Sequence, residues 1–256
     1  MAYTDKLRVV YGDYTLGVHG EGFDYIFSYA QGGLESLVKN GYEWLYRCPK
    51  PTFWRATTDN DRGSKFHIKS GSWLAADMFI ECKDVEVITD GKSQGKPCAP
   101  ENNKYGGDVF AENVIVKYVY ETITTPATTV EVVYSVDNKG KIAVNVSYKG
   151  AKGLPQLPVF GLRFIMPTLA DKYTYEGLSG ETYPDRMAGA EKGIFEIDDI
   201  SLTNYLVPQE CGMRMGTEWL EVTRHTSLNN CRKGNSNQIL RIEKKDKGFA
   251  FSCLPY

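Results

Sequence analysis

Three consecutive segments of this chain alternate apolar and polar side chains, the pattern of strands that bury one face. NVIVKYVYETIT at 113–124, TTVEVVYSV at 128–136 and KIAVNVSYK at 141–149 are also rich in β-branched and aromatic residues. Pro126 interrupts the first pair, and the turn-forming sequence DNKG at 137–140 separates the second pair. The pattern predicts an antiparallel meander of long strands.

Strand character extends to LRVVYGDYTLGV at 7–18, whereas helix signals are few. The best helix candidate is SWLAADMFIE at 72–81, in which several apolar residues could share one face. These residues are Trp73, Leu74, Met78 and Phe79. Strands and helices do not alternate along the chain, so a parallel α/β sheet is not expected. We predict an all-β fold of two packed antiparallel sheets with little helix, and an exposed loop over 90–108.

The predicted domain is a single one covering residues 1–256. Its last segment, GFAFSCLPY at 248–256, has the pattern of a strand that stops while still apolar. We therefore expect the domain to be truncated at its C-terminal end.

The composition excludes several classes of protein. A chain of 256 residues can bury a sizeable core, and its formal net charge of −2 argues against nucleic-acid binding. No apolar stretch approaches the length of a membrane span, and the N-terminus lacks a signal-peptide pattern. The cysteines are scattered without a C-x-x-C pair, which favours free thiols and a cytoplasmic protein. The six cysteines are Cys48, Cys82, Cys98, Cys211, Cys231 and Cys253.

The segment PTFWRATTDNDRG at 51–63 places aromatic rings beside a dense group of acidic residues. A calcium loop, a sugar-binding lip and a structural corner are three possible interpretations. An EF-hand loop starting at Asp59 would need glycine at its sixth position and glutamate at its twelfth. Glycine is the fifth residue instead, and the twelfth is Ser70, so no metal site is predicted. Trp and Tyr rings stack on sugars and Asp, Asn and Arg bind hydroxyls, which keeps the sugar-binding interpretation open.

Other catalytic patterns are weak. The three histidines, His19, His67 and His225, lack zinc-ligand spacing, and no nucleophile motif or phosphate-binding glycine loop is present. Glu176, Glu181 and Asp185 could supply the two carboxylates that glycoside hydrolysis requires. The alternative is a turn around Tyr183 and Pro184 that Asp185 and Arg186 stabilise by local contacts, and we favour this interpretation.

Several ordered motifs resemble the C-terminal domain of LacZ-type β-galactosidases of glycoside hydrolase family 2, which some bacteria encode separately as the β-galactosidase small chain. PTFWRATTDNDRG resembles the family motif R-x-P-x-F-x-R-A-x-x-D-N-D-x-G. Downstream, E-x-Y-x-D-R is present at 181–186, and PQECGMRMGTEWLEV at 208–222 resembles the family segment P-Q-E-N-G…W-L. The resemblance runs from the N-terminus to Tyr256.

The sequence departs from the family pattern in three places. Leu178 and Ser179 replace a glycine-proline step, and Cys211 replaces the asparagine after P-Q-E. The family domain also continues beyond F-S-x-L-P-Y, in a tail that carries a tryptophan of the sugar site. The resemblance therefore does not provide that tryptophan.

The resemblance implies a large antiparallel supersandwich, similar to galactose mutarotase, that borders the substrate pocket of a catalytic barrel. The catalytic glutamates, and any magnesium ion, would lie on a large partner chain, since no strand-helix alternation here could build that barrel. No catalytic residue, metal ligand or cofactor is therefore expected on this chain. A galactoside such as lactose is the implied substrate, and neither nucleic acid nor membrane is an expected partner.

Two groups of residues are the candidate site. The first is a substrate-proximal loop after D-N-D-x-G, within the segment 63–72, in which glycines would permit movement. Its residues are Gly63, Ser64, Lys65, Phe66 and His67. The second group has a structural role, with aromatic residues and an arginine anchoring a strand end beside a tight acidic turn. Its residues are Phe53, Trp54, Arg55, Asp59, Asn60, Asp61, Glu181, Tyr183, Asp185 and Arg186.

Two alternatives share the predicted fold. A stand-alone aldose 1-epimerase-like enzyme would combine a glutamate base with histidines, a set that is hard to assemble when His19 lies in an N-terminal strand. A non-catalytic carbohydrate-binding module would differ from an enzyme subunit only in what it contacts.

Overall fold

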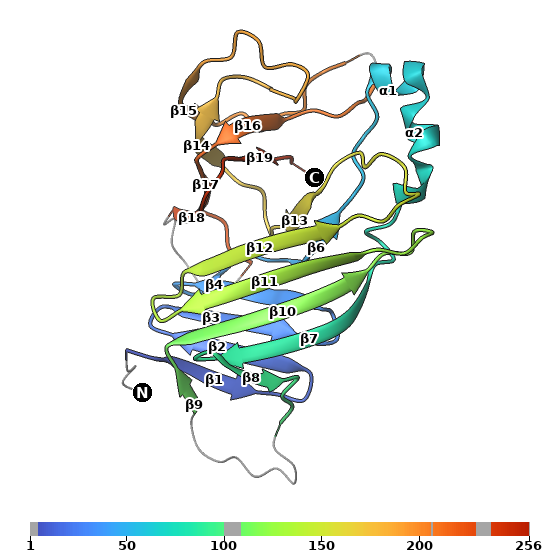
Figure 1. Cartoon of the computed structure of the whole chain (residues 1–256). Helices are drawn as coiled ribbons and strands as arrows, with labels where there is room; N and C mark the ends of the chain where they lie inside the picture. The colour runs from blue at the N-terminus through green and yellow to red at the C-terminus, as the bar shows by residue number, and fades with distance from the viewer. Residues whose placement is uncertain (1–4, 100–108, 206, 229–236, 256) are drawn as a thin grey trace. The chain divides into compact units, whose positions relative to one another are not determined.

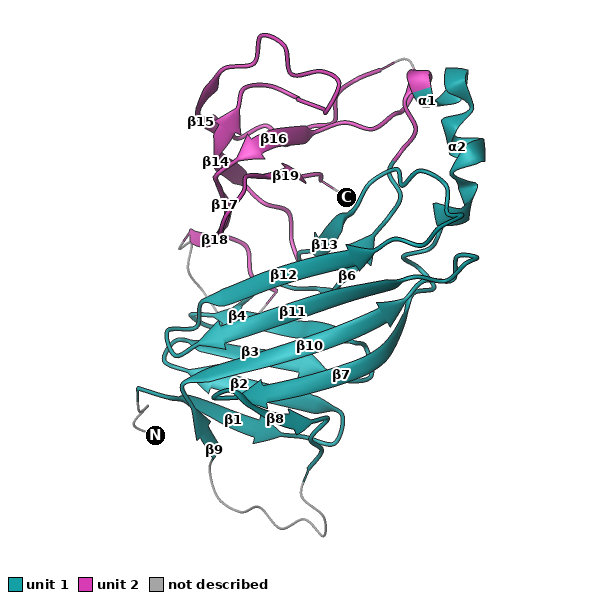
Figure 2. Ribbon diagram, viewed as in Figure 1, with its two compact units in different colours: residues 1–55, 61–166 teal, residues 56–60, 167–256 magenta. Residues whose placement is uncertain are grey.

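The structure is a computed structural model that describes residues 5–99, 109–205, 207–228 and 237–255. Its strands are paired in antiparallel sheets, which confirms the predicted all-β fold (Figure 1). The chain forms two compact units, drawn in teal and magenta in Figure 2. Unit 1 comprises 1–55 and 61–166, and unit 2 comprises 56–60 and 167–256. The prediction of a single domain stays a prediction.

Two large sheets form most of unit 1. The first has the strand order β5-β4-β3-β2-β1-β9 and the second β12-β11-β10-β7-β8. The bounds of the first sheet are β1 Leu7–Tyr11, β2 Thr15–Gly20, β3 Phe23–Ser28, β4 Gly33–Lys39, β5 Tyr42–Glu43 and β9 Val109–Ala111. Those of the second are β7 Glu81–Thr89, β8 Lys92–Gly95, β10 Asn113–Glu121, β11 Thr129–Asp137 and β12 Ile142–Lys149. The strands β6 Arg47–Thr52 and β13 Gly161–Ile165 pair separately.

The two large sheets pack face to face around a core of alternate residues. On β10 and β11 every second side chain is buried, as the alternation predicts. Tyrosine hydroxyls extend across the core: Tyr118 donates to the carbonyl of Gly33 at 3.2 Å, and Tyr25 to that of Gly140 at 2.7 Å. Both hydroxyls are thereby satisfied inside an apolar layer.

The predicted meander is confirmed in its order and turns. β11 pairs with both β10 and β12, and the DNKG turn closes through the bond from the Gly140 amide to the Asp137 carbonyl. Gly140 has φ 75°, the left-handed conformation that glycine adopts without strain. The segment 7–18 is divided into β1 and β2 by a turn at Gly12. Of the predicted loop 90–108, residues 92–95 form the exposed strand β8, and 100–108 lie outside the described residues.

The predicted helix over 72–81 is wrong. The chain there forms the 3₁₀ turn η1 Gly71–Trp73, then further turns, and enters β7 at Glu81. Ala75 has φ 62°, which is incompatible with a right-handed helix. Of the proposed apolar face only Trp73 is buried, while Leu74, Met78 and Phe79 are exposed. Two short helices precede the 3₁₀ turn η1, namely α1 Asp59–Ser64 and α2 Phe66–Lys69.

Unit 2 contains a four-stranded sheet in the order β15-β14-β17-β18 and a separate pair of strands, β16 and β19. Aromatic rings join the two, since Phe251 meets Tyr173 and Tyr175 edge to face at 5.5 and 5.4 Å. The bounds are β14 Lys172–Leu178, β15 Lys192–Ile197, β16 Met213–Thr217, β17 Trp219–Arg224, β18 Gln238–Glu243 and β19 Phe249–Ser252. Among the described residues of the whole chain, no helix has the length and apolar character of a membrane span.

Candidate functional site

Phe53 anchors the start of the 51–63 motif in unit 1. It follows β6 directly and is fully buried, with its ring stacked on Trp73 at 5.4 Å and tilted against Phe160 at 6.0 Å. An aromatic cluster of this kind holds the end of β6 against the segment that follows α2. Trp54, the next residue, is half-buried. The predicted anchoring role is thus clearest for Phe53.

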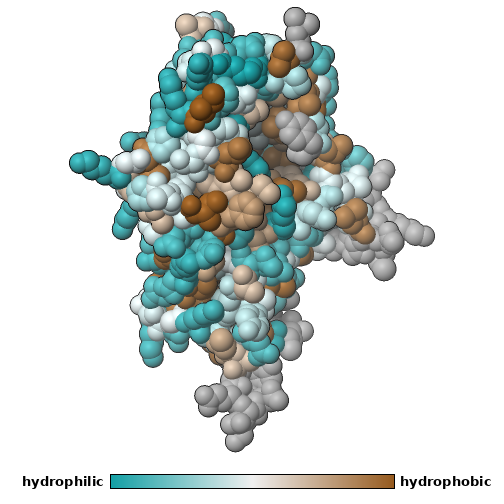
Figure 3. All heavy atoms as spheres, turned by 90° about the vertical axis from the view of Figure 1, so that its right-hand side faces the viewer, coloured by the Kyte–Doolittle hydropathy of each residue, from teal (hydrophilic) through white to brown (hydrophobic). Residues whose placement is uncertain are grey.

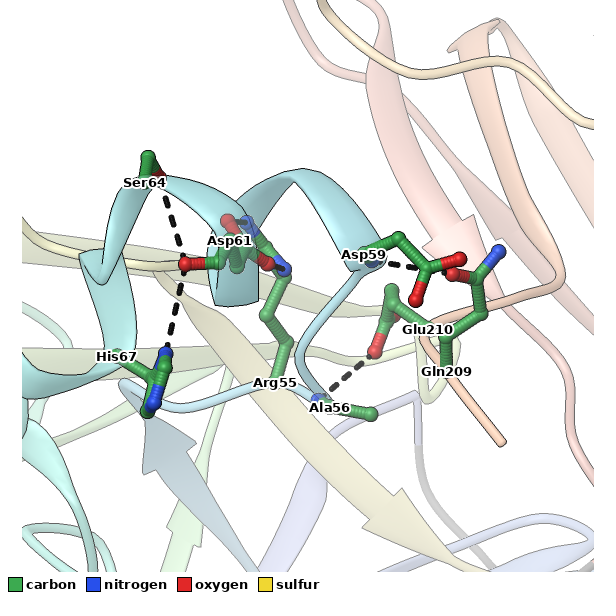
Figure 4. Close-up of polar contacts among 8 residues, drawn as sticks. All are labelled: Arg55, Ala56, Asp59, Asp61, Ser64, His67, Gln209 and Glu210. Atoms are coloured by element: carbon green, nitrogen blue, oxygen red, sulfur yellow. Dashed lines mark hydrogen bonds and ion pairs between the residues drawn. The ribbon is translucent and has the colours of Figure 1, made fainter. Parts of the chain in front are cut away.

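Arg55 and Asp61 form the central ion pair of the motif. The two terminal guanidinium nitrogens of Arg55, Nη1 and Nη2, donate to the two carboxylate oxygens of Asp61 at 2.5 and 3.1 Å (Figure 4). Asp61 is only 8% exposed, and Arg55 also lies over the ring of Phe66 at 5.9 Å. A bidentate pair fixes both position and orientation. It therefore ties the strand end to α1.

The acidic residues lie in α1 rather than in the tight turn that the sequence suggests. The Asp61 carbonyl accepts a hydrogen bond from the Ser64 hydroxyl at 3.3 Å and lies 3.4 Å from Nδ1 of His67 (Figure 4). Lys65 separates α1 from α2 with φ 58°. The predicted loop 63–72 therefore consists largely of short helices, and its movement stays a prediction.

Residues 56–60, the part of the motif that belongs to unit 2, bind the P-Q-E segment. The amide of Ala56 donates to the Glu210 carboxylate at 3.1 Å, and the amide of Asp59 donates to the Gln209 side chain at 3.3 Å (Figure 4). This contact between residues 56–60 and the P-Q-E segment is not predicted by the sequence motifs. The one sequence feature that could have indicated the contact is the presence of polar residues in both of these family motifs, 51–63 and 208–222.

The E-x-Y-x-D-R residues at 181–186 form a turn within unit 2. The backbones of Tyr183 and Arg186 exchange hydrogen bonds of 2.9 and 3.3 Å, and the Arg186 guanidinium lies 5.1 Å from the Tyr183 ring. Arg186 also approaches Glu181 at 3.9 Å. Burial, with a smaller effect of the Glu181 charge, raises the pKa of Tyr183 to about 12. Asp185 is exposed within this turn.

The alternative catalytic carboxylates are held by other side chains. Glu176, on β14, accepts a hydrogen bond from the indole nitrogen of Trp219 at 2.8 Å, and Glu181 accepts one from the Thr203 hydroxyl. Such contacts are typical of residues that stabilise a sheet and a turn.

Among the described residues, His19 and His225 each pair with a nearby aspartate. His19 bonds Asp24 at 2.8 Å, and His225 bonds Asp171 at 2.5 Å, so each has its own local partner. Within the described part of the chain, no three His, Cys, Asp or Glu side chains gather as a metal site.

The sequence profile of the family described as "Beta galactosidase small chain" matches residues 19–256. The chain belongs to the β-galactosidase small chain family. A β-galactosidase small subunit of Latilactobacillus sakei is 56% identical to it, over 100% of this chain and 81% of the relative.

Longer relatives match the same region. A β-galactosidase of Clostridium acetobutylicum is 38% identical over 75% of this chain, and one of Streptococcus thermophilus is 31% identical over 97%. The chain spans only 19% and 21% of these two proteins. The small chain therefore corresponds to a minor part of the longer β-galactosidases.

Proposed function

We propose that this chain is the small subunit of a β-galactosidase of glycoside hydrolase family 2, active on terminal β-D-galactosides such as lactose. The observation that carries the proposal is the 56% identity to a small subunit over the whole of this chain. The motif residues are consistent with it, because Arg55 and Asp61 build a structural corner rather than an acid and nucleophile pair.

The large chain, in this proposal, supplies the catalytic glutamates and any magnesium ion. The described residues of this chain offer no three-donor cluster, and its glutamates Glu176 and Glu181 are engaged by neighbours. The small chain then acts by completing the pocket rather than by proton transfer. We place the assembled enzyme in the cytoplasm, in keeping with free thiols at Cys48, Cys82, Cys98, Cys211 and Cys253.

Reconstitution tests the proposal. The purified chain should not hydrolyse o-nitrophenyl β-galactoside by itself. Mixed with the large subunit that partners the Latilactobacillus sakei protein, it should form a complex of higher mass that does. Hydrolysis by the isolated chain would contradict the assignment of the catalytic groups. Failure to associate would favour a non-catalytic carbohydrate-binding module.

We further propose that Gly63, Ser64, Lys65, Phe66 and His67 border the galactoside pocket. Gly63 is suited to a test, because a Cβ added there meets no atom within 4 Å. Gly63→Leu should change kcat/KM of the assembled enzyme severalfold while the free energy of unfolding changes by less than about 1 kcal/mol. Gly150→Leu, where a Cβ meets only ordinary contacts with Tyr148, is the control. Unchanged kinetics in Gly63→Leu would remove this segment from the pocket.

A further inference from the structure

The segment 66–79 of unit 1 exposes an unusual amount of apolar surface. Four of its large side chains are between 59% and 75% exposed, and they are separated by only a few residues. These are Ile68 at 67%, Leu74 at 59%, Met78 at 75% and Phe79 at 59%. Figure 3 views the molecule from the side of α1 and α2 and shows brown apolar residues interrupting the hydrophilic surface of that face. Clustered exposed apolar side chains mark sites of association.

The inner side of the segment holds it in place. Trp73 is 1% exposed, stacks on Phe53 and donates from its indole nitrogen to the Pro155 carbonyl at 3.1 Å. The hydroxyl of Ser70 donates to the Gln156 carbonyl at 2.8 Å. Turning the segment over to bury its apolar outer side would break these contacts. The exposed side chains are therefore presented on an anchored backbone.

The backbone conformation of the segment is also unusual. Among the described residues, four that are not glycine have positive φ. Two are Asn40 and Asp90, residue types that tolerate the left-handed region, whereas the other two are Lys65 and Ala75. These two lie at the start of α2 and beside Leu74. Strained conformations of this kind persist where the surroundings hold them and are concentrated at functional positions.

The charged side chains from Arg62 to Ala76, in and just before the first part of the segment, are basic. No acidic residue occurs from Arg62 to Ala76, while Lys65 and Lys69 are exposed. The first acidic residue beyond them, Asp77, already contacts Thr52 and Arg163 at 3.3 and 3.7 Å. A complementary partner would therefore offer an apolar centre with acidic residues at its rim.

The longer relatives indicate which partner this is. In the β-galactosidases of Clostridium acetobutylicum and Streptococcus thermophilus the region matching this chain is 19% and 21% of one continuous polypeptide. The rest of the enzyme is thus covalently attached in those proteins. A separate small chain needs a surface that replaces this covalent attachment.

We propose that the 66–79 segment is a docking surface for the β-galactosidase large chain. Leu74, Met78 and Phe79 form its apolar centre, and Lys69, together with Lys65 just before the segment, forms its basic rim. This inference rests on the proposed function and adds the location of the partner contact. The four exposed apolar side chains of the segment, Ile68 included, supply only part of the roughly 800 Å² per partner that a stable interface buries. Further surfaces of the small chain therefore take part.

The double variant Met78→Asp/Phe79→Asp in the full chain tests the proposal. Binding of the Latilactobacillus sakei large subunit, measured by biolayer interferometry, should be at least about 30-fold weaker than for the wild type. Tyr14→Asp, at another side chain of unit 1 that is 67% exposed, is the matched control and should bind as the wild type does. Urea unfolding midpoints of all three proteins should agree, because each replaced side chain is exposed.

A second variant tests the rim without touching the apolar centre. Lys65→Glu/Lys69→Glu should slow association severalfold, and the difference should shrink as salt is added. Wild-type affinity in both double variants would overturn the docking surface while leaving the proposed function intact. No binding by the wild-type chain would instead contradict the proposed function. Self-association of the wild-type chain that Met78→Asp/Phe79→Asp abolishes would assign the surface to a second copy and also overturn the proposal.

Discussion

The β10–β11 pair and the 66–79 segment both belong to unit 1, but different forces determine their structures. On β11 the residues Val130, Val132 and Tyr134 are fully buried and alternate with half-buried neighbours. In the segment the buried residues are Ser70, Trp73 and Ala76, which recur every three positions on successive turns. The strand pair follows a local pattern, whereas the segment depends on a few distant anchors. Substitutions in the two regions should therefore differ in how much stability they remove and in how far through the protein the loss extends.

The largest effect is expected in the strand pair. Val132→Asp places a charge without a partner in the core, which should lower the free energy of unfolding by on the order of 4 kcal/mol. Val133→Asp is the matched control, because this half-buried neighbour pairs across the strands with Lys117 and Asn145. Urea denaturation followed by circular dichroism measures both. Equal losses for the two variants would contradict the assignment of faces.

Trp73→Ala should be the most damaging change in the segment, at about 3 kcal/mol, because it removes a buried indole. The loss should be local: hydrogen exchange should accelerate over residues 66–79 while amides of β10 and β11 stay protected. Trp73→Phe keeps a ring against Phe53 but loses the bond to Pro155, so it should cost less. Uniform acceleration in the strands as well would show that the two regions unfold together.

Asp61→Asn tests the ion pair that joins the strand end to α1. Removing the charge leaves the Arg55 guanidinium, which is 23% exposed, without its carboxylate and should cost about 2 kcal/mol. Asp59→Asn, at an exposed position of the same helix, should change stability by less than about 0.5 kcal/mol. Thermal unfolding of both variants provides the comparison. If the two changes had similar effects, the Arg55–Asp61 pair would not be what stabilises the corner.

The smallest effect depends on pH and concerns Cys48 on β6. Burial raises the pKa of this thiol from 9.0 to about 11, against a smaller lowering by Lys50. Because the folded-state pKa is the higher one, the stabilisation is complete below about pH 9 and is lost as pH rises towards 11.

Across that range the wild type should therefore lose on the order of 1–2 kcal/mol more stability than Cys48→Ala. Urea denaturation at a series of pH values measures the difference. Cys98→Ala, at an exposed cysteine, should follow the wild-type profile. Parallel profiles for the wild type and Cys48→Ala would show that the thiol is accessible to water.

The sequence was sufficient where structure follows a local pattern. The alternation in 113–149 predicted β10, β11 and β12, and DNKG predicted the turn that Gly140 closes. The helix over 72–81 failed because its apolar residues were assigned to one buried face. Only Trp73 among them is buried, and nothing in the local sequence distinguishes it from Met78 or Phe79.

The candidate site was predictable only in part, because several of its contacts join residues that are far apart in the sequence. The sequence predicted arginine contacts to the acidic residues at 59–61, and in the structure Arg55 pairs with Asp61. The contacts of Ala56 with Glu210 and of Asp59 with Gln209 span more than a hundred residues and depend on the tertiary fold. The anchors of Trp73 and Ser70 on Pro155 and Gln156 are equally remote in sequence.

The excursion of residues 56–60 into unit 2 limits how this protein can be divided. A fragment beginning at residue 167 would contain Gln209 and Glu210 without the backbone amides of Ala56 and Asp59 that they bind. Dividing the chain at that point would separate these side chains from backbone partners that lie about 150 residues upstream. Residues 56–60 therefore have to accompany unit 2, although each unit has its own sheets.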